Sequence, residues 1–335
     1  MTTTRWAVLG TGQIARTFLA ALAGADDARV VAVGSSDGTR ARRFAAEHGV
    51  PGAGTYAEVL VDTDVDAVYI GTVHTTHAAL TVQALRAGKP VLCEKPLGLD
   101  AAQTTTVTAA AEAAGLPVVE AYKYRFSPFT DALRLAVVEG RIGRVRSVRA
   151  SFGFTAPTRS GRLFDPASAG GAVYDVGGYP VSLAVAVARW SGVSPEALTV
   201  TAADGGLARR TGVETHARAL VTGPGFDARV EAAITRDLTR AVDIEGDRGS
   251  IHADQGWGSG RASARSFEIR TGASTEQVEV PVVDPFLVEA RALAVAAAAG
   301  HLEDARMPWG DSTATARLLA RWRSDLRATA DQQRD

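Results

Sequence analysis

Short apolar runs alternate with amphipathic segments of helical length through the first third of the chain. The apolar runs predict strands at 6–9, 29–33, 65–70, 90–93 and 116–120, and the segments between them predict helices at 14–23, 39–48, 76–88 and 101–115. Apolar strands separated by helices indicate a parallel sheet covered on both faces. We therefore expect an α/β fold in which residues 1–121 form a doubly wound Rossmann domain.

Beyond residue 121 the alternation gives way to strands in series. Helices are predicted at 128–139, 175–189, 286–299 and 312–328, and strands at 145–154, 198–203, 217–221, 228–234, 241–245, 266–270 and 277–283. Strands without intervening helices indicate an open, mostly antiparallel sheet, so residues 122–335 are expected to form an α+β domain. The alternation in 228–234 leaves one sheet face for a partner, which predicts a homodimer or homotetramer.

Composition narrows the possible partners. The 335 residues suffice for about two domains. A net charge of −1 gives no basic face for nucleic acid. Cys93 alone forms no internal disulfide, and no stretch approaches the roughly 18 uninterrupted apolar residues of a membrane helix. The first residues lead straight into an apolar strand without a signal-peptide pattern, so we expect a cytoplasmic protein.

The first motif with chemical meaning is a GxGxxA run between the first predicted strand and helix. Its first glycine permits a tight turn, its second lets the backbone approach a pyrophosphate, and its alanine lets the helix pack on the sheet. The helix N-terminus offers free N–H groups to phosphates. This context predicts dinucleotide binding by Gly10, Thr11, Gly12, Gln13 and Ile14.

The end of the second predicted strand selects the dinucleotide. No acidic residue stands directly at the strand end to hold the ribose 2′-hydroxyl of NAD. Ser35 and Ser36 are followed by Arg40, which suits a 2′-phosphate. Alternatively, Asp37 folds back to the ribose and Arg40 only begins a helix. We favour NADP, with NAD as the alternative.

Further polar residues follow the ends of predicted strands, the edge at which open α/β sheets bind ligands. We expect cofactor contacts from Thr72, His74 and His77, and substrate contacts from Tyr122, Lys123 and Arg125. The HxxH spacing of the two histidines suggests zinc, but no cysteine or acid completes a site nearby, so no metal is expected. Arg125 is equally well a domain-junction ion-pair residue, and half of the alternating aromatic residues at 122, 124 and 126 are expected in the core.

Lysine is rare in this chain, which has 33 arginines but only three lysines, at positions 89, 95 and 123. Burial lowers the pKa of a lysine, which can then exchange a proton, whereas arginine stays charged. Lys95 follows a predicted strand in the sequence Glu94-Lys95-Pro96. In the second domain, Asp175 and Tyr179 are spaced i, i+4 on one helix and share a face.

Together these residues resemble the Gfo/Idh/MocA oxidoreductase family, which includes glucose-fructose oxidoreductase and inositol dehydrogenases. The resemblance runs from the glycine loop through the E-K-P motif and the GG…D-x-G-x-Y helix to residues 243–251. Within the family, the chain looks most like the branch of dimeric dihydrodiol dehydrogenase and NADP-dependent D-xylose dehydrogenase.

The resemblance implies roles for individual residues. Lys95 matches the catalytic lysine beside the nicotinamide and the substrate hydroxyl, and its bond to Pro96 matches one that is often cis. Glu94 matches a residue near the nicotinamide ribose. Asp175 and Tyr179 match a helix pair that meets the lysine from the other domain.

Two positions depart from the family pattern. Ser36 stands where relatives that use NADP often have arginine, which leaves the choice of cofactor open. Lys123 stands where relatives often have an apolar or aromatic residue, so substrate details do not carry over.

The implied chemistry is hydride transfer between a nicotinamide and a secondary alcohol or ketone of a sugar, cyclic polyol or vicinal diol. The protein supplies orientation and the proton. Either Tyr179, with its phenolate stabilised by Lys95, or Lys95 itself exchanges that proton. A non-catalytic dinucleotide-binding regulator or scaffold of the same fold is the alternative, although such a protein would be free to lose Lys95, Asp175 and Tyr179.

Overall fold

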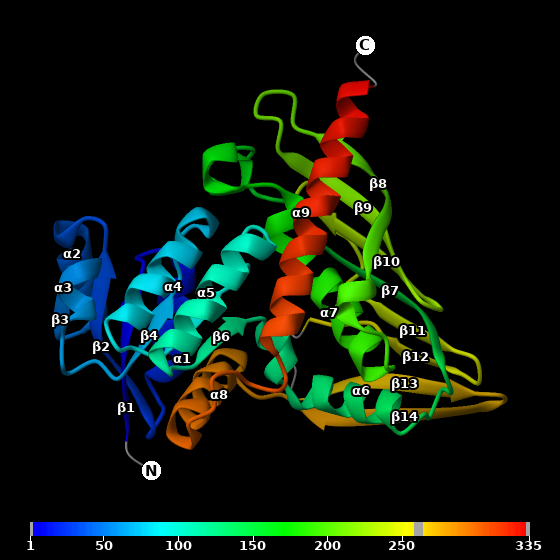
Figure 1. Cartoon of the computed structure of the whole chain (residues 1–335), viewed down its shortest axis with the longest axis horizontal. Helices are drawn as coiled ribbons and strands as arrows, with labels where there is room; N and C mark the ends of the chain where they lie inside the picture. The colour runs from blue at the N-terminus through cyan, green and yellow to red at the C-terminus, as the bar shows by residue number, and fades with distance from the viewer. Residues whose placement is uncertain (1–2, 258–263, 333–335) are drawn as a thin grey trace. The chain divides into compact units, whose positions relative to one another are not determined.

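The computed structural model describes residues 3–257 and 264–332. The chain divides into two compact units (Figure 1). Unit one comprises Met1–Gly98, Ala102–Phe126 and Val283–Trp309, and unit two comprises Leu99–Ala101, Ser127–Val282 and Gly310–Asp335. The chain therefore returns to unit one after residue 282. The predicted division at residue 121 did not include this return. The division into domains 1–121 and 122–335 stays a prediction.

Unit one contains a six-stranded parallel sheet in the order β3-β2-β1-β4-β5-β6. Its strands are β1 (Thr4–Leu9), β2 (Ala28–Ser35), β3 (Gly52–Thr55), β4 (Ala67–Ile70), β5 (Val91–Glu94) and β6 (Val118–Ala121). The helices that follow these strands are α1 (Gln13–Leu22), α2 (Gly38–His48), α3 (Tyr56–Leu60), α4 (His77–Arg86) and α5 (Ala101–Ala114). This order is that of the Rossmann fold, so the predicted fold class is confirmed.

The central strands form the core of unit one, as their continuous apolar runs predicted. Every residue of β4, β5 and β6 is buried. Leu9, Ile70 and Cys93 have no exposed surface and belong to one hydrophobic cluster. A parallel sheet needs this pattern because helices cover both of its faces.

Strand β3 and helix α3 are absent from the prediction. Strand β3 has the sequence Gly-Ala-Gly-Thr, and its low β propensity gives no strand signal in the sequence. The segment is extended because it pairs with β2. Helix α3 has only five residues but begins with a capping box: the Thr55 hydroxyl accepts from Glu58 N, and the Glu58 carboxylate accepts from Thr55 N. The T-x-x-E sequence was the available signal for this helix.

Helix α8 (Pro285–Ala299) belongs to unit one although it follows the second sheet in sequence. It packs against α1, and an ion pair of 2.7 Å joins Arg291 Nε to Asp27 Oδ2. The indole Nε1 of Trp309, at the end of the same return segment, donates to Val118 O at 3.0 Å. The return segment thus completes the first unit.

Unit two contains an eight-stranded sheet in the order β14-β13-β12-β11-β7-β10-β9-β8. Its strands are β7 (Val145–Gly153), β8 (Thr199–Leu207), β9 (Glu214–Gly223), β10 (Phe226–Ala233), β11 (Val242–Gly246), β12 (Ser250–Ala253), β13 (Ala264–Thr271) and β14 (Ser274–Pro281). Among the strands that the structure describes in this sheet, only β10 and β7 pair in parallel, so the mostly antiparallel prediction is confirmed. The four-residue β12 was not predicted; pairing with β11 and β13 forms it.

The helices of unit two are α6 (Pro128–Val138), α7 (Gly178–Trp190) and α9 (Trp309–Gln332). A π-helical turn, Val173–Gly177, leads into α7. The helical stretch Pro166–Trp190 is long and apolar enough to cross a membrane, but its most apolar window is entirely buried inside the protein. Complete burial is typical of a core helix, and α7 indeed packs on β7 and β10.

Candidate functional site

The glycine loop has the geometry that its sequence predicted. Gly10 has φ +119°, and its N–H donates to Gly34 O at 2.9 Å. A Cβ at this position would lie 2.6 Å from Gly71 O. The turn therefore excludes any side chain at Gly10 for reasons internal to the fold.

Gly12 differs from Gly10, because nothing in the protein requires glycine there. Its backbone is extended (φ −84°), and a Cβ would meet no described atom within 4 Å. Gly12 is the N-cap of α1, and no side chain caps that end. An uncapped helix N-terminus beside open space is the cradle that a pyrophosphate requires, so Thr11, Gly12, Gln13 and Ile14 fit a dinucleotide.

At the end of β2, a guanidinium is held between two hydroxyls. Arg40 Nε donates to Ser35 Oγ at 2.9 Å, and Arg40 Nη2 donates to Ser36 Oγ at 2.8 Å. Ser35 is buried, whereas Ser36 and Arg40 are exposed. This cluster of one charged donor group and two hydroxyls suits a phosphate.

Asp37 is engaged elsewhere in the structure. Its Oδ1 accepts from the N–H groups of Thr39 and Arg40, at 2.8 and 3.3 Å, and thereby caps α2. These backbone bonds lower the pKa of the carboxyl. The structure therefore favours the phosphate arrangement over the alternative in which Asp37 turns to a ribose.

The loop after β4 places its two histidines inside the protein. His77 has no exposed surface; its Nδ1 lies 2.8 Å from Pro96 O and its Nε2 lies 3.3 Å from Thr72 O. Burial lowers the pKa of the ring, and a neutral imidazole has one N–H, which we assign to the shorter contact. His77 thus ties the β4 loop to the segment after Lys95. His74 is also buried, and the two rings meet edge to face with centroids 5.8 Å apart.

Glu94 ends β5 and is anchored through one oxygen. Tyr69 Oη donates to Glu94 Oε1 at 2.9 Å, and Lys123 Nζ lies 3.9 Å from the same oxygen. Lys95 follows at once and is partly exposed, and the Lys95-Pro96 bond is cis, as the resemblance implied. Both residues therefore stand at the carboxyl edge of the parallel sheet, where Rossmann domains bind their ligands.

The segment after β6 forms a 3-10 turn, η2 (Lys123–Phe126), instead of an extended strand. Tyr122, Tyr124 and Phe126 are all buried, so the expectation that half of them pack in the core was wrong. Arg125 is 1% exposed, and its Nε and Nη2 donate to Arg306 O at 2.9 and 2.6 Å. Arg125 therefore fastens this turn to the return segment of unit one.

In unit two, Asp175 lies in the π turn that precedes α7 and Tyr179 lies in the first turn of α7. Arg162 Nη2 donates to Asp175 Oδ1 at 2.7 Å. The Tyr179 ring meets Phe152 and Trp257, with centroid distances of 5.0 and 5.8 Å. A π turn adds one residue to a helix, and such turns occur often at functional sites.

Sequence reasoning missed several residues around these predicted ones. Phe152, Arg162 and Trp257 come from a strand and two loops with no motif, and only their aromatic or cationic character offered a signal. Tyr69 and Glu289 lie within elements that read as ordinary core, and their polar groups in an apolar run were the signal available. Within residues 3–257 and 264–332, no group of three or more His, Cys, Asp or Glu side chains could hold a metal ion.

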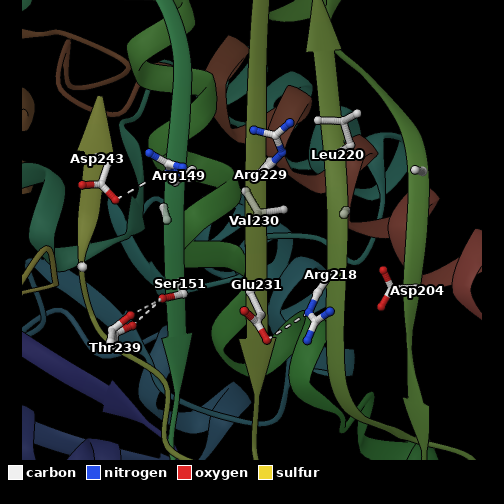
Figure 2. A pocket seen from close by; sticks show the side chains of 14 residues that line it. Arg149, Ser151, Asp204, Arg218, Leu220, Arg229, Val230, Glu231, Thr239 and Asp243 are labelled. Carbon is white, nitrogen blue, oxygen red and sulfur yellow. Dashed lines mark hydrogen bonds and ion pairs between the residues drawn. The ribbon is translucent and has the colours of Figure 1, made fainter. Parts of the chain in front are cut away.

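One hollow lies on the surface of the second sheet. Its volume is about 480 Å³. Figure 2 shows its lining residues on β8, β9, β10, β7 and β11. Its lining includes Arg149, Arg218 and Arg229 together with Asp204 and Glu231. It contains none of the predicted catalytic or cofactor residues, so it is a feature of the sheet surface.

Comparison with protein families matches both parts of the chain. Residues 4–122 match the oxidoreductase family with NAD-binding Rossmann fold, and residues 130–252 match the GFO/IDH/MocA C-terminal domain. The trans-1,2-dihydrobenzene-1,2-diol dehydrogenase of Homo sapiens is 36% identical over 251 residues, which are 74% of this chain and 73% of that protein. The enzyme of the same name from Mus musculus is 33% identical over 76% of this chain and 75% of its own length.

Solved structures agree over nearly the whole chain. KijD10, a 3-ketoreductase from Actinomadura kijaniata in complex with NADP and TDP-benzene, superposes with a TM-score of 0.85 and 28% identity, covering 97% of this chain and 98% of that chain. An aldose-aldose oxidoreductase from Caulobacter crescentus superposes with a TM-score of 0.83 and 24% identity, covering 98% of both chains, and shows the shared fold.

Proposed function

The chain belongs to the Gfo/Idh/MocA oxidoreductase family and is an NAD(P)-dependent oxidoreductase, and from this premise we propose its cofactor, substrate class and catalytic residues. We propose that it uses NADP(H) to interconvert a secondary alcohol and a ketone in a sugar, cyclic polyol or vicinal diol. One related enzyme is named as a dehydrogenase of a dihydrobenzenediol, which is a cyclic vicinal diol, and another is named as a 3-ketoreductase. Both names describe the interconversion of a secondary alcohol and a ketone.

The observation that carries the proposal is the end of β2. Arg40 is held by two serine hydroxyls, and the nearby carboxylate of Asp37 is occupied by capping α2. A ribose 2′-phosphate would find a cation and two hydroxyls there, whereas a 2′-hydroxyl would find no free carboxylate of Asp37. The arrangement therefore favours NADP(H) over NAD(H).

The surroundings of Tyr179 support a ring-shaped substrate. Phe152 and Trp257 present aromatic surface beside the Tyr179 phenol, and Trp257 is fixed because its Nε1 donates to Ser151 O at 2.8 Å. Aromatic faces bind the apolar faces of sugars and cyclic diols, and carboxylates such as Asp175 accept from hydroxyls. We therefore assign substrate binding to these residues of unit two.

Three side chains are proposed to handle the proton. When bound, the nicotinamide cofactor supplies or accepts the hydride. In the direction of alcohol oxidation, the hydroxyl proton passes either to a Tyr179 phenolate or to the neutral amine of Lys95 as the C–O bond becomes a carbonyl. Asp175 orients the hydroxyl. Where Tyr179 takes the proton, the positive charge of Lys95 stabilises the phenolate and the developing oxyanion.

Two variants decide which group takes the proton. Tyr179→Phe removes only a hydroxyl, so kcat falls by about 10²- to 10⁴-fold if Tyr179 is the acid and base. If Lys95 is the acid and base, Tyr179→Phe lowers kcat little, while Lys95→Ala lowers it by about 10²- to 10⁴-fold. The pH profile of the surviving activity reports the remaining group.

The proposal is tested with the purified chain and a panel of aldoses, inositols and cyclic vicinal diols, assayed with both NADP⁺ and NAD⁺. We expect NADP⁺ reduction with at least one ring alcohol and a higher kcat/KM with NADP⁺ than with NAD⁺. If the chain oxidises none of these alcohols and reduces none of the corresponding ketones with NADPH, the proposed substrate class is refuted. Preference for NAD⁺ would refute the cofactor assignment.

We further propose that the chain is a cytoplasmic homo-oligomer that assembles through the outer face of the second sheet, without nucleic acid or a membrane as partner. That face carries arginine side chains and acidic side chains, as Figure 2 shows, and Arg218 Nε lies 3.3 Å from Glu231 Oε1. No described residue pairs with Arg229 or Asp204, which lie on β10 and β8. A two-fold axis brings such opposite charges of two copies together.

A further inference from the structure

A buried charge cluster lies behind the end of β5 in unit one. Glu94, Lys123 and Glu289 come from β5, η2 and α8, three elements far apart in sequence. Glu94 and Glu289 are 5% and 0% exposed, and the Lys123 side chain is 17% exposed. Charged groups with so little access to water are costly unless they compensate one another.

Glu289 is the unusual member of this cluster. Neither carboxyl oxygen has a hydrogen-bond partner within the part of the chain that the structure describes. Burial raises the pKa of Glu289, the charges of Glu94 and Asp284 raise it further, and Lys123 opposes them. Tyr69 and Cys93 are further titratable neighbours; burial raises the pKa of Tyr69, and the charges of Glu94, Glu289 and Cys93 raise it further. Complete burial, the lack of a hydrogen-bond partner among the described residues and the raised pKa all favour the neutral, protonated form of Glu289.

Lys123 is placed to compensate Glu94. Its Nζ lies 3.9 Å from Glu94 Oε1 and 4.3 Å from the centroid of the Phe286 ring, one turn before Glu289 on α8. Tyr69 donates to the same Oε1. No described residue donates to Glu94 Oε2, which leaves that oxygen for a ligand. The carboxylate is therefore anchored on one side and open on the other.

The position of Glu94 in the sheet indicates which half of the cofactor it serves. In the strand order 3-2-1-4-5-6, the second mononucleotide half binds over β4, β5 and β6. Glu94 is the last residue of β5, and the 2′-phosphate site lies at the other half, after β2. The cluster therefore stands under the nicotinamide half.

We propose that Lys123 is a positioning residue that anchors Glu94, and that Lys123 together with a neutral Glu289 holds the net charge beneath the nicotinamide near zero. The inference rests on the proposed function, because it needs the NADP(H) cofactor. NADP⁺ carries a positive nicotinamide and NADPH a neutral one. The charge of the cluster therefore sets the relative affinity for the two forms, with Lys123 opposing NADP⁺ and Glu94 favouring it.

The test measures dissociation constants of NADP⁺ and NADPH for the whole chain at neutral pH, by calorimetry without substrate. Lys123→Met leaves the Glu94 carboxylate uncompensated, so the ratio of the two constants shifts toward NADP⁺ by about tenfold. Lys123→Arg restores the charge and returns the ratio toward wild type. Lys123→Gln, which keeps a polar head, replaces the methionine variant if that variant does not fold.

Glu289→Gln tests the protonation of Glu289 separately. A protonated carboxyl and an amide are both neutral, so we expect the ratio to stay within about twofold of wild type, whereas loss of a negative charge would shift it toward NADPH by about tenfold. Arg291→Met is the matched control: it removes a cation from α8 that pairs with Asp27, and the ratio should not change.

The outcomes separate this inference from the proposed function. An unchanged ratio in Lys123→Met, or equal weakening of both forms, overturns the role of Lys123. A shift toward NADPH in Glu289→Gln overturns the protonated state of Glu289. A wild-type chain that binds neither NADP⁺ nor NADPH overturns the proposed function itself.

Discussion

Arg40 Nη2 donates to Ser36 Oγ at 2.8 Å, while its Nε donates to Ser35 Oγ. The family resemblance implies arginine at the position of Ser36 in relatives that use NADP, and in this chain Arg40, four residues later in α2, brings its guanidinium to the Ser36 hydroxyl. The charge needed for a 2′-phosphate is thus present although the residue at the strand end is not the usual one.

Arg40→Ala should lower the affinity for NADPH by about 10- to 100-fold, because a charge-assisted hydrogen bond to the phosphate is lost. The affinity for NADH, which lacks the 2′-phosphate, should change little. Fluorescence titration with both cofactors gives the two changes. Arg42→Ala is the control, since Arg42 is on the same helix and its Nη2 donates to Thr39 Oγ1 and not to Ser35 or Ser36. Equal losses for NADPH and NADH would remove Arg40 from the phosphate site.

Gly12→Ala separates folding from cofactor binding. The backbone at Gly12 is open to any residue, and a methyl group meets no described atom, so the free energy of unfolding without cofactor should change by less than about 1 kcal/mol. The same methyl group fills the space that a pyrophosphate needs, so NADPH affinity should fall by at least about 10-fold. Denaturant melts and NADPH titration measure both. Undiminished NADPH binding would place the dinucleotide elsewhere.

His77 gives a pH dependence of stability with a defined sign. Burial lowers its pKa below the usual 6.5, so the unfolded chain binds a proton that the folded chain resists. The contribution of neutral His77 is complete above pH 6.5 and is lost as the pH falls below that value. His77→Asn keeps a donor for Pro96 O without a titrating ring, so its stability should decline less than wild type between pH 7.5 and 5.5. Parallel decline of the two proteins in urea melts would show that His77 does not contribute.

The charged outer face of the second sheet predicts the assembly state. Light scattering of the wild type should give at least twice the 34.9 kDa of one chain. Arg229→Glu reverses a charge in the cavity of Figure 2 and should shift the protein toward monomer, whereas Arg134→Glu on α6, outside that cavity, should not. A wild-type mass of 34.9 kDa would exclude assembly through this face.

Periodicity and motif spacing predicted the parallel Rossmann sheet, the mostly antiparallel second sheet and the glycine loop. These features depend on local patterns, such as apolar strands between helices and glycine at a turn with positive φ. Strand β3 and β12 escaped because each has four residues and becomes extended only by pairing with neighbours. The return of α8 to unit one escaped because packing against α1 is a contact between distant parts of the chain.

For the candidate site, the sequence predicts positions but not side-chain contacts. The sequence indicates candidate ligand contacts at Gly12, Arg40 and Lys95, because each follows a strand at the edge where such sheets bind ligands. The capping of α2 by Asp37, the internal bonds of His77 and the burial of Glu289 beside Lys123 depend on side-chain geometry. No spacing in the sequence reveals such contacts, and they change which polar residues are available to a ligand.

The central claim is that the E-K-P lysine serves the reaction and not the binding of the cofactor. The most direct measurement compares wild type with Lys95→Ala in NADPH affinity and in turnover of the alcohol that the substrate panel identifies. Gly12 and the α1 N-terminus are untouched, so NADPH affinity should stay within about threefold, while kcat should fall by about 10²- to 10⁴-fold. Near-normal kcat in Lys95→Ala would contradict the account.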